Sequence, residues 1–352
     1  MIVDEDIREA TQIPGVPLPE EQTQVFGHAD ARSRLSGLID AGRLPSAILL
    51  AGPQGIGKAT LGFSFAREIF QRTGDETPER IREQVAAGSF PNLFVLRRAA
   101  KDPKGFYSEI RIGDIRQQKG SDPVGLRERL RMTRGRAGTR VCIIDSIDDC
   151  NTSASNALLK LLEEPPSDTL FLLISHRPGG LLPTIRSRCQ TCVLRGLSDA
   201  EVAETVSSIL GEAEAGREAQ AVRFGAGRPR KAIEYLQMDG NDLIEQVQTW
   251  LVEGVTSGAS TLALADAIVA APETSIMFAR ELVTRHLADQ ARRAAAPGAF
   301  DRVHVASWGQ LWEKARALFT EADIYNLDAR QTWIMLLDEI QENARNQLQA
   351  SV

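Results

Sequence analysis

A glycine-rich segment contains the residues whose types and spacing most clearly suggest chemistry. It reads Gly-Pro-Gln-Gly-Ile-Gly-Lys-Ala from Gly52 to Ala59, close to the P-loop pattern G-x-x-x-x-G-K-[ST]. In that pattern backbone N–H groups wrap phosphates, the lysine reaches the outer phosphate oxygens, and the final hydroxyl coordinates Mg²⁺. Lys58 is present, but Ala59 stands where the hydroxyl is needed, and a helical step of ~100° turns the hydroxyl of Thr60 away. We therefore expect the segment to hold a nucleotide better than it can hydrolyse one.

Two apolar elements flank the segment in the order that a P-loop requires. Residues 47–51 are continuously apolar, as in a buried parallel strand, and residues 59–70 have apolar side chains at helical spacing. A strand, a glycine-rich turn and a helix are thus predicted in succession. The candidate nucleotide-binding residues in this part of the chain are Gly52, Gly55, Gly57, Lys58, Ala59 and Thr60.

An acidic residue ends a second apolar strand, predicted over residues 141–145. Asp145 at this end of a parallel strand would lie beside the phosphates and hold a metal through water, unless it only caps the strand. In hydrolysing proteins of this class the next residue is usually a glutamate that activates water, whereas this chain has Ser146. A serine hydroxyl is not ionised near pH 7 and cannot act as the general base. Two catalytic parts are missing independently, which indicates a degenerate NTPase fold.

Three further segments point to a family. Residues 153–166 read SASNALLKLLEEPP and predict a helix ended by two prolines, residues 169–175 predict a buried strand, and residues 182–189 read LPTIRSRC. This run resembles the bacterial clamp-loader subunits of the AAA+ class, over roughly residues 25–232. The damaged P-loop, the missing glutamate, the intact Ser-Arg-Cys and the length of 352 residues are most similar to the delta-prime class of these subunits.

The resemblance implies a role for Arg188, the arginine of the Ser-Arg-Cys motif. In clamp loaders this arginine enters the ATP site of the neighbouring subunit and stabilises charge on the γ-phosphate, as an arginine finger does. Arg188 would then act in trans, whereas by its chemistry alone it could simply pair with a carboxylate. Ser175 matches the position called sensor 1, and Arg230 in the run GRPRKA matches sensor 2. A hydrogen-bonded turn serine and a solvated helix start are the respective alternatives.

The four cysteines do not suggest a disulfide framework. Cys189 and Cys192 have C-x-x-C spacing, but a structural zinc site needs four ligands, and no second pair of cysteines or histidines accompanies them. Many delta-prime subunits have a cysteine zinc module between the P-loop helix and the next strand, and residues 72–89 contain no cysteine. We expect no zinc or other metal site, and ATP or ADP held without efficient hydrolysis.

Charge and composition exclude several classes of protein. The net charge of −6 and the pI of about 5.5 argue against a protein that wraps DNA by itself. No apolar stretch approaches the ~18 residues of a membrane span, and residues 1–24 lack the features of a secretory signal. We therefore expect a cytoplasmic chain with a mobile N-terminal arm. An arginine-rich stretch is expected to face solvent or a partner, with contact to DNA phosphates as the alternative; it contains Arg127, Arg129, Arg131, Arg134, Arg136 and Arg140.

The patterns together predict an α/β P-loop AAA+ domain, with a parallel sheet and flanking helices, followed by a small helical lid and an all-α C-terminal collar domain. The expected boundaries are 1–24 for the arm, 25–196 for the P-loop domain, 197–240 for the lid and 241–352 for the collar. Strands are expected near Ile48, Phe94, Ile143, Leu172 and Val193, and a capping box at 198–201 opens the lid. Apolar stripes in the collar are expected to be partly interface; they contain Ile244, Val247, Leu251, Trp308, Leu311, Trp312, Ala315, Trp333, Leu336, Leu337 and Ile340.

The resemblance implies a clamp-loader stator subunit of the DNA polymerase III holoenzyme. Such a subunit assembles with gamma/tau- and delta-type subunits in a hetero-pentamer and helps load the sliding clamp onto primer–template DNA. It would supply Arg188 to a neighbouring ATPase while hydrolysing little ATP itself. One alternative is an ATP-hydrolysing motor subunit, which would have to function despite Ala59 and Ser146. Another is a purely scaffolding replication protein in which Arg188 has no catalytic role.

Overall fold

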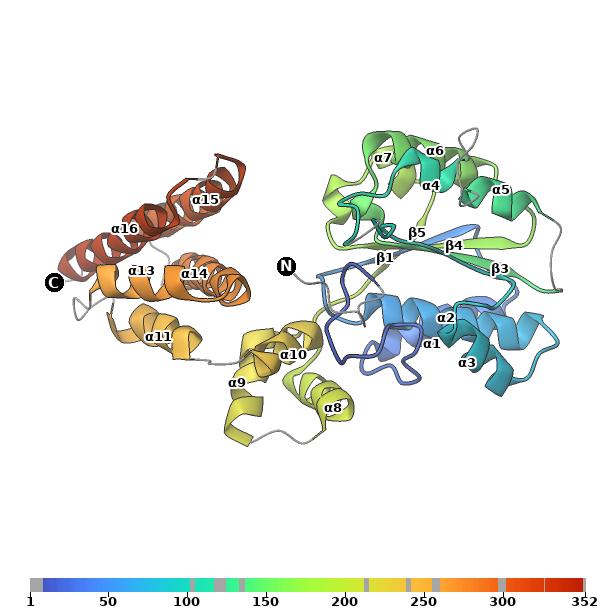
Figure 1. Ribbon diagram of the computed structural model, residues 1–352, viewed down its shortest axis with the longest axis horizontal. Coiled ribbons are helices and arrows are strands. Elements are labelled where there is room, and N and C mark those ends of the chain that lie inside the picture. Colours follow the sequence, from blue (N-terminus) through green and yellow to red (C-terminus); the bar gives the residue numbers. More distant parts are fainter. Residues whose placement is uncertain are drawn as a thin grey trace. The chain divides into compact units, whose positions relative to one another are not determined.

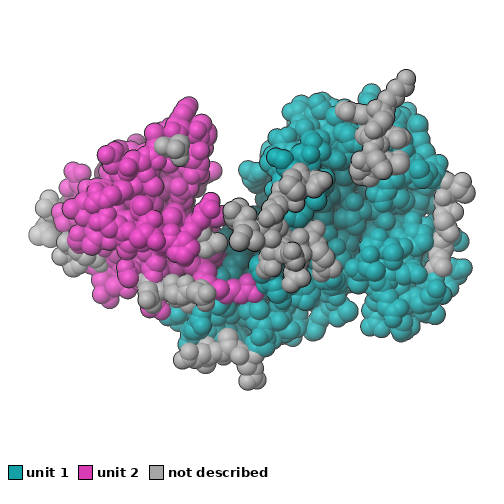
Figure 2. Space-filling model, in the orientation of Figure 1, with its two compact units in different colours: residues 1–236 teal, residues 237–352 magenta. Residues whose placement is uncertain are grey.

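A computed structural model describes residues 9–101, 105–116, 125–132, 137–211, 215–238, 242–254, 260–296, 302–325 and 327–350. The chain forms two compact units, residues 1–236 and residues 237–352, which Figure 2 shows in different colours. The first unit contains the described strands and the P-loop, so the candidate nucleotide site lies entirely within it.

A parallel five-stranded sheet forms the centre of the first unit (Figure 1). The order of its strands is β2-β3-β4-β1-β5. The three middle strands are buried almost throughout, which explains why their sequences are continuously apolar rather than alternating. All five predicted strands are confirmed; they are β1 (Ala47–Ala51), β2 (Leu93–Leu96), β3 (Arg140–Asp145), β4 (Thr169–Ser175) and β5 (Gln190–Val193).

Helices cover both faces of this sheet (Figure 1). One face is covered by α1 (Ala29–Asp40), α2 (Lys58–Thr73) and α3 (Pro78–Ala86). The opposite face is covered by α4 (Ile112–Ile115), α5 (Leu126–Arg131), α6 (Thr152–Glu163) and α7 (Pro183–Arg186). The P-loop AAA+ architecture expected from the sequence is therefore confirmed.

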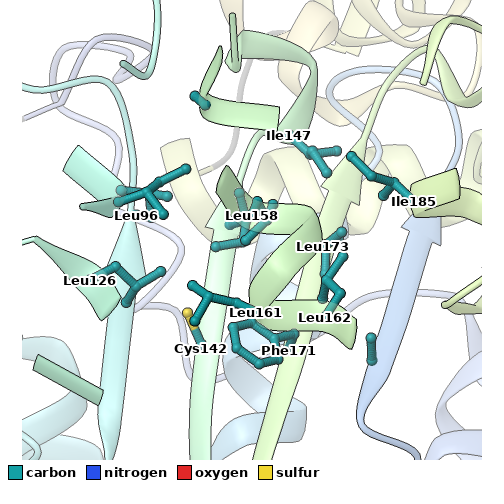
Figure 3. Packing of buried hydrophobic residues seen from close by; sticks show 14 of the residues in the cluster. Leu96, Leu126, Cys142, Ile147, Leu158, Leu161, Leu162, Phe171, Leu173 and Ile185 are labelled. Atoms are coloured by element: carbon teal, nitrogen blue, oxygen red, sulfur yellow. The ribbon is translucent and has the colours of Figure 1, made fainter. Parts of the chain in front are cut away.

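The apolar stripe of α6 packs on the sheet and fixes this face of the core (Figure 3). Leu158, Leu161 and Leu162 lie in one buried cluster with Phe171 and Leu173 of β4. Burying each such side chain contributes about 1.5–3 kcal/mol. Helix α6 begins where the side chain of an N-cap asparagine accepts the N–H of Ala154, and it ends just before the two prolines. The packing holds α6 and α7 in place, and α7 leads directly to Arg188.

Three helices form the lid at the end of the first unit: α8 (Asp199–Leu210), α9 (Ala215–Gly225) and α10 (Pro229–Gln237). The predicted capping box is present at the start of α8. The backbone N–H of Ser198 donates to the carboxylate of Glu201 at 2.8 Å, and the N–H of Glu201 donates to the hydroxyl of Ser198 at 3.3 Å. Phe224 and Tyr235 stack with their ring centroids 5.2 Å apart, which joins α9 to α10.

The second unit is helical in its described part. It contains α11 (Asp242–Thr249), a π-helical turn (Trp250–Gly254), α13 (Thr261–Ala270), α14 (Glu273–Ala294), α15 (Arg302–Tyr325) and α16 (Ala329–Ala350). The predicted apolar stripes of α11, α15 and α16 supply its core, and in each helix most of the stripe is buried. No helix in the described ranges has both the length and the apolar character that crossing a membrane requires.

Candidate functional site

The P-loop joins β1 to α2, and its glycines meet two different requirements. Gly55 (φ 81°) and Gly57 (φ 92°) have left-handed backbone conformations, which residues with a Cβ rarely adopt. At Gly52 a Cβ would come within 2.3 Å of the carbonyl oxygen of Leu194, just after β5. The strand, the turn and the helix N-terminus thus have the arrangement that binds phosphates in other P-loops.

Lys58 is the first residue of α2 and is 3% exposed. Its ammonium donates hydrogen bonds to the carbonyl oxygens of Gly52 at 2.7 Å and Pro53 at 2.5 Å. Burial lowers the pKa of Lys58 to about 8, although the carboxylates of Asp145 and Asp148 act in the opposite direction. A phosphate bound at the loop would supply negative charge beside this buried ammonium and keep it protonated.

Asp145 ends β3 at the same edge of the sheet, but its carboxylate is already paired with a cation. Leu96 of β2 lies opposite Ile144 of β3, so the next residues, Arg97 and Asp145, are also neighbours. The Nε of Arg97 donates to Oδ2 of Asp145 at 3.4 Å. Burial raises the pKa of Asp145, and the charge and hydrogen bond of Arg97 oppose that effect. The sequence pattern predicts the acid but not its arginine partner.

A divalent cation does not fit this arrangement. A P-loop protein holds Mg²⁺ with the hydroxyl after its lysine and with the aspartate at the strand end. Ala59 has no hydroxyl, and the guanidinium of Arg97 contacts the carboxylate of Asp145. Ser146 is 4% exposed and supplies no base. The residues present therefore fit nucleotide phosphates better than they fit a complex of metal and nucleotide.

Ser175, the predicted sensor 1 residue, ends β4 and is fully buried. Its hydroxyl donates to Oδ1 of Asp148 at 3.0 Å, and Asp148 also accepts the backbone N–H groups of His176 at 2.5 Å and Arg177 at 3.3 Å. Ser175 thus belongs to a hydrogen-bonded turn, which is the alternative that the sequence offered to a sensor role. The sensor role of Ser175 stays a prediction. His176, which the sequence did not single out, is neutral at pH 7 because burial lowers its pKa to about 4.

Residues 9–24 do not form the mobile arm that the sequence suggests. Ile13 and Leu18 are buried, and Arg67 of α2 donates to the carbonyl oxygens of Glu20 at 3.0 Å and Gln22 at 2.6 Å. Residues 1–8 lie outside the described part of the chain. Long-range apolar packing and hydrogen bonds hold the segment beside α2, and the composition of an acidic, proline-containing stretch does not reveal them.

Arg230, the predicted sensor 2 residue, reaches the P-loop from the start of α10. Its backbone N–H donates to the carbonyl oxygen of Gly55 at 3.2 Å, and its Nη1 donates to that of Thr11 at 2.5 Å. Its Nε also pairs with Glu234 at 2.8 Å. A Cβ on Gly55 would lie 2.8 Å from the Cβ of Arg230, so glycine lets the lid helix approach the loop this closely. The arginine thus connects the lid, the P-loop and the N-terminal segment.

A cavity of about 250 Å³ lies between these three elements. Its lining combines apolar side chains, such as Val16, Phe26 and Ile233, with the charged groups at the P-loop. This combination suits a ligand with an apolar ring and a phosphate chain. Gly52, Ser175 and Arg188 are not among the residues that line it. The predicted site residues that do line it are Gly55, Gly57, Lys58, Ala59, Thr60, Asp145 and Arg230.

Arg188 follows α7, and its side chain is 36% exposed. Its Nη2 lies 2.9 Å from a carboxylate oxygen of Glu163, and its Nη1 donates to the carbonyl oxygen of Thr184 at 2.9 Å. The carboxylate pairing expected from its chemistry alone is therefore present within this chain. An ion pair this exposed is weak, so an anion of another molecule can replace Glu163.

The arginine-rich stretch before β3 does not form a single surface. Arg140 is 5% exposed and donates to two backbone carbonyl oxygens, at 2.6 and 3.1 Å. The expectation that it faces solvent, a partner or DNA is wrong, because it lies within β3 and its guanidinium satisfies buried carbonyls. Arg134 and Arg136 lie outside the described residues. The side chains of the remaining described members of the stretch are partly or fully exposed: Arg127, Arg129 and Arg131.

The four cysteines have free thiols. Burial raises the pKa of Cys189 to about 11, so this thiol of the C-x-x-C pair remains protonated at neutral pH. Within the described ranges, no group of three or more His, Cys, Asp or Glu side chains is arranged to hold a metal ion. The absence of zinc stays a prediction that a metal analysis of purified protein can test.

Comparison with known proteins agrees with this reading of the residues. A family model described as DNA polymerase III, delta subunit, matches residues 27–198. The region from residue 27 to residue 198 is thus similar to the delta-subunit family of DNA polymerase III. The delta-prime subunit of DNA polymerase III from Pseudomonas aeruginosa is 35% identical over 215 residues, which are 59% of this chain and 60% of that protein. The tau subunit from Escherichia coli is 27% identical over 273 residues, which are 74% of this chain and 40% of that protein.

The match to this family model and the match to a delta-prime subunit confirm the resemblance to the delta-prime class of clamp-loader subunits. The matched region spans no more than 60% of the length of either relative. A solved structure of a Thermotoga maritima RuvB variant has a TM-score of 0.43 and 18% identity, and the match covers 94% of this chain and 92% of that one.

Proposed function

We propose that this chain is a stator subunit of a bacterial clamp loader. In this proposal it assembles with gamma/tau- and delta-type subunits into a hetero-pentamer, supplies Arg188 to a neighbouring ATP site, and helps load the sliding clamp onto primer–template DNA. Its own P-loop holds ATP or ADP without efficient hydrolysis.

The contrast between the two sites of the chain supports this proposal most. The chain's own site lacks the metal-binding hydroxyl and the general base, and Asp145 is paired with Arg97. Arg188, in contrast, has an exposed side chain and only a weak ion pair. An intact Ser-Arg-Cys motif in a chain whose own hydrolytic site is damaged is useful for catalysis only if the arginine serves the phosphates of another subunit.

Two other functions make different demands on the same residues. A motor subunit would need bound Mg²⁺ and an activated water, although neither Ala59 nor Ser146 supplies them. A pure scaffold would leave Arg188 without a catalytic role. The exposure of Arg188 favours the stator over the scaffold, because an arginine that serves only this fold has no need to remain accessible.

The test is a reconstituted loader that contains Arg188→Ala in this chain. We expect normal assembly by size-exclusion chromatography and reduced ATPase activity in the presence of clamp and primed DNA. An arginine finger contributes about 10³-fold or more at the one site that it completes, so total turnover falls modestly and clamp loading falls further. Wild-type ATPase and clamp-loading rates in the assembled variant would favour the scaffold.

Two further variants serve as controls in the same assembly. Arg186→Ala removes another exposed arginine of the same short segment and is expected to leave the ATPase rate unchanged. Lys58→Ala damages the chain's own P-loop and is expected to affect clamp loading far less than the matching change in a motor subunit. An equal loss would support the motor function.

A further inference from the structure

Arg97 is the residue at which this nucleotide site differs most from a metal-dependent one. It follows β2, and its side chain is 18% exposed. Its Nη1 lies 2.8 Å from a carboxylate oxygen of Glu9 and 2.8 Å from one of Glu20, and its Nη2 lies 2.9 Å from the other oxygen of Glu20. With Asp145 at 3.4 Å, a single guanidinium lies among three carboxylates. Carboxylate oxygens are the protein ligands that Mg²⁺ prefers, yet here they surround an arginine.

We propose that Arg97 takes the place of the divalent cation in this site, so that the cavity binds a nucleoside di- or triphosphate without metal. The proposal rests on the part of the proposed function in which the P-loop holds a nucleotide. It does not depend on the trans role of Arg188.

The position of Arg97 allows it to act on a bound phosphate chain. Arg97 and Lys58 both line the cavity, and Arg97 lies beside Asp145, where a P-loop protein keeps its metal. The centroid of the Phe63 ring lies 5.3 Å from the guanidinium carbon of Arg97, so this residue of α2 packs against the guanidinium. A guanidinium has five N–H groups. Those of Arg97 donate to Glu20 from Nη1 and Nη2 and to Asp145 from Nε, and Nη1 also forms the ion pair with Glu9. Among the described residues no carboxylate takes the second N–H of Nη2, and in this proposal that N–H donates to a phosphate oxygen.

The charge around Arg97 keeps it in place as a permanent cation. Burial alone would lower the pKa of Arg97, but the hydrogen bond to Glu20 and the charges of Asp145, Glu9 and Glu20 together raise it above its ordinary value. A metal ion would have to displace a guanidinium that is bidentate to Glu20, and a bidentate pair of this kind is strong. The guanidinium thus already offsets one of these negative charges when a nucleotide arrives.

The lining of the cavity has the charge that a polyphosphate needs even without metal. Its cationic side chains, Lys58, Arg97, Arg98 and Arg230, outnumber its carboxylates, Glu9, Asp145 and Asp149. Metal-dependent P-loops add positive charge through Mg²⁺, whereas this chain adds it through an arginine that the fold supplies.

The experiment is a calorimetric titration of the full chain with ADP and with ATP, in excess EDTA and in excess Mg²⁺. We expect the dissociation constants in the two buffers to agree within about twofold. Arg97→Met is expected to weaken binding in EDTA by about tenfold or more, because it removes a charge-assisted hydrogen bond. A wild-type affinity that rises tenfold with Mg²⁺ would overturn the proposal.

A second readout does not depend on nucleotide. Arg97→Met leaves three carboxylates without their cation, so Mn²⁺ is expected to raise its melting temperature and to give a bound-metal signal in electron paramagnetic resonance. Wild type is expected to show neither effect. The triple variant Arg97→Met/Glu9→Gln/Glu20→Gln removes two of the carboxylates and is the matched control that loses the Mn²⁺ response. If wild type responds to Mn²⁺ as strongly as Arg97→Met, Arg97 does not occupy the metal's place.

The outcomes separate this inference from the proposed function. Nucleotide binding that requires Mg²⁺ overturns the inference and leaves the stator proposal intact. No binding of either nucleotide in either buffer overturns both the inference and the nucleotide part of the proposed function. In both cases the ATPase activity of the assembled Arg188→Ala loader still tests the trans role independently.

Discussion

The guanidinium of Arg188 lies 2.9 Å from the carboxylate of Glu163, so this contact joins the first and last segments of the motif run, residues 153–166 and 182–189. The side chains are 36% and 42% exposed, so the pair contributes only about 0–1 kcal/mol to stability. Glu163 therefore positions the side chain of Arg188, but the weak ion pair leaves the guanidinium able to change its partner. In the proposed assembly, a phosphate bound by a neighbouring subunit has more charge than one carboxylate and would replace Glu163 as the partner of this guanidinium.

The first prediction concerns this partner. Glu163→Gln is expected to leave the ATPase rate of the reconstituted loader at or slightly above the wild-type value, because it removes an internal competitor for Arg188. The neighbouring Glu164→Gln is the matched control, since Glu164 is also exposed. Steady-state phosphate release with clamp and primed DNA measures the effect. A loss as large as that of Arg188→Ala would show that Glu163 is itself needed for hydrolysis.

The second prediction concerns the isolated chain. Its turnover of ATP is expected to lie well below ~1 s⁻¹, the low end of ordinary enzyme rates. Ala59→Thr/Ser146→Glu is expected to remain as slow, although it restores both missing groups, because Arg97 still pairs with Asp145. The assay is phosphate release with Mg²⁺. Lys58→Ala added to each protein is the control, because any activity that remains in it comes from contaminating enzymes. Turnover above ~1 s⁻¹ in wild type would contradict the stator proposal.

The third prediction follows from the buried carboxyl of Glu9. Burial raises its pKa from 4.5 to about 7, an effect that Arg97 opposes and that Asp145 and Glu20 reinforce. A carboxyl whose folded pKa is raised binds more protons in the folded state than in the unfolded state between these two values. The free energy of unfolding contributed by Glu9 therefore falls as the pH rises from about 4.5 to 7.

Glu9→Gln cannot ionise and should remove this dependence. Its free energy of unfolding is expected to match wild type near pH 5 and to exceed it by about 1–3 kcal/mol at pH 8. Urea denaturation at both pH values measures the difference, and Glu79→Gln on the exposed surface of α3 is the control. An equal difference at the two pH values would contradict the assignment to Glu9.

The fourth prediction tests the approach of the lid to the P-loop. Gly55→Ala places a Cβ 2.8 Å from that of Arg230, whereas Gly42→Ala, also at a positive φ, meets no atom within 4 Å. Both variants lose stability because of the backbone conformation, by about 1–2 kcal/mol. Gly55→Ala is expected to lose about 1–3 kcal/mol more through overpacking, and to weaken nucleotide binding. If urea denaturation showed equal losses of stability in the two variants, the lid would be able to move away from the added Cβ at no cost in free energy.

The elements that build the sheet could be predicted because their signals are local. The buried strands of a parallel sheet are continuously apolar, and β1 and β4 begin and end at the predicted residues. The P-loop, the capping box at Ser198 and the apolar stripe of α6 are likewise short patterns in which each residue's neighbours along the chain determine its role. The two defects at Ala59 and Ser146 could be read in the same way.

The contacts between distant segments could be determined only from the tertiary structure. Glu9 and Glu20 meet Arg97 across 88 and 77 positions of sequence, and no periodicity or motif links them. The same is true of Arg140, which belongs to a basic run by sequence but is buried because β3 passes through the core. Local sequence thus determined which catalytic groups this chain has and which it lacks. The fold determined that Arg97 faces Asp145, because burial and charge pairing depend on which segments the sheet brings together.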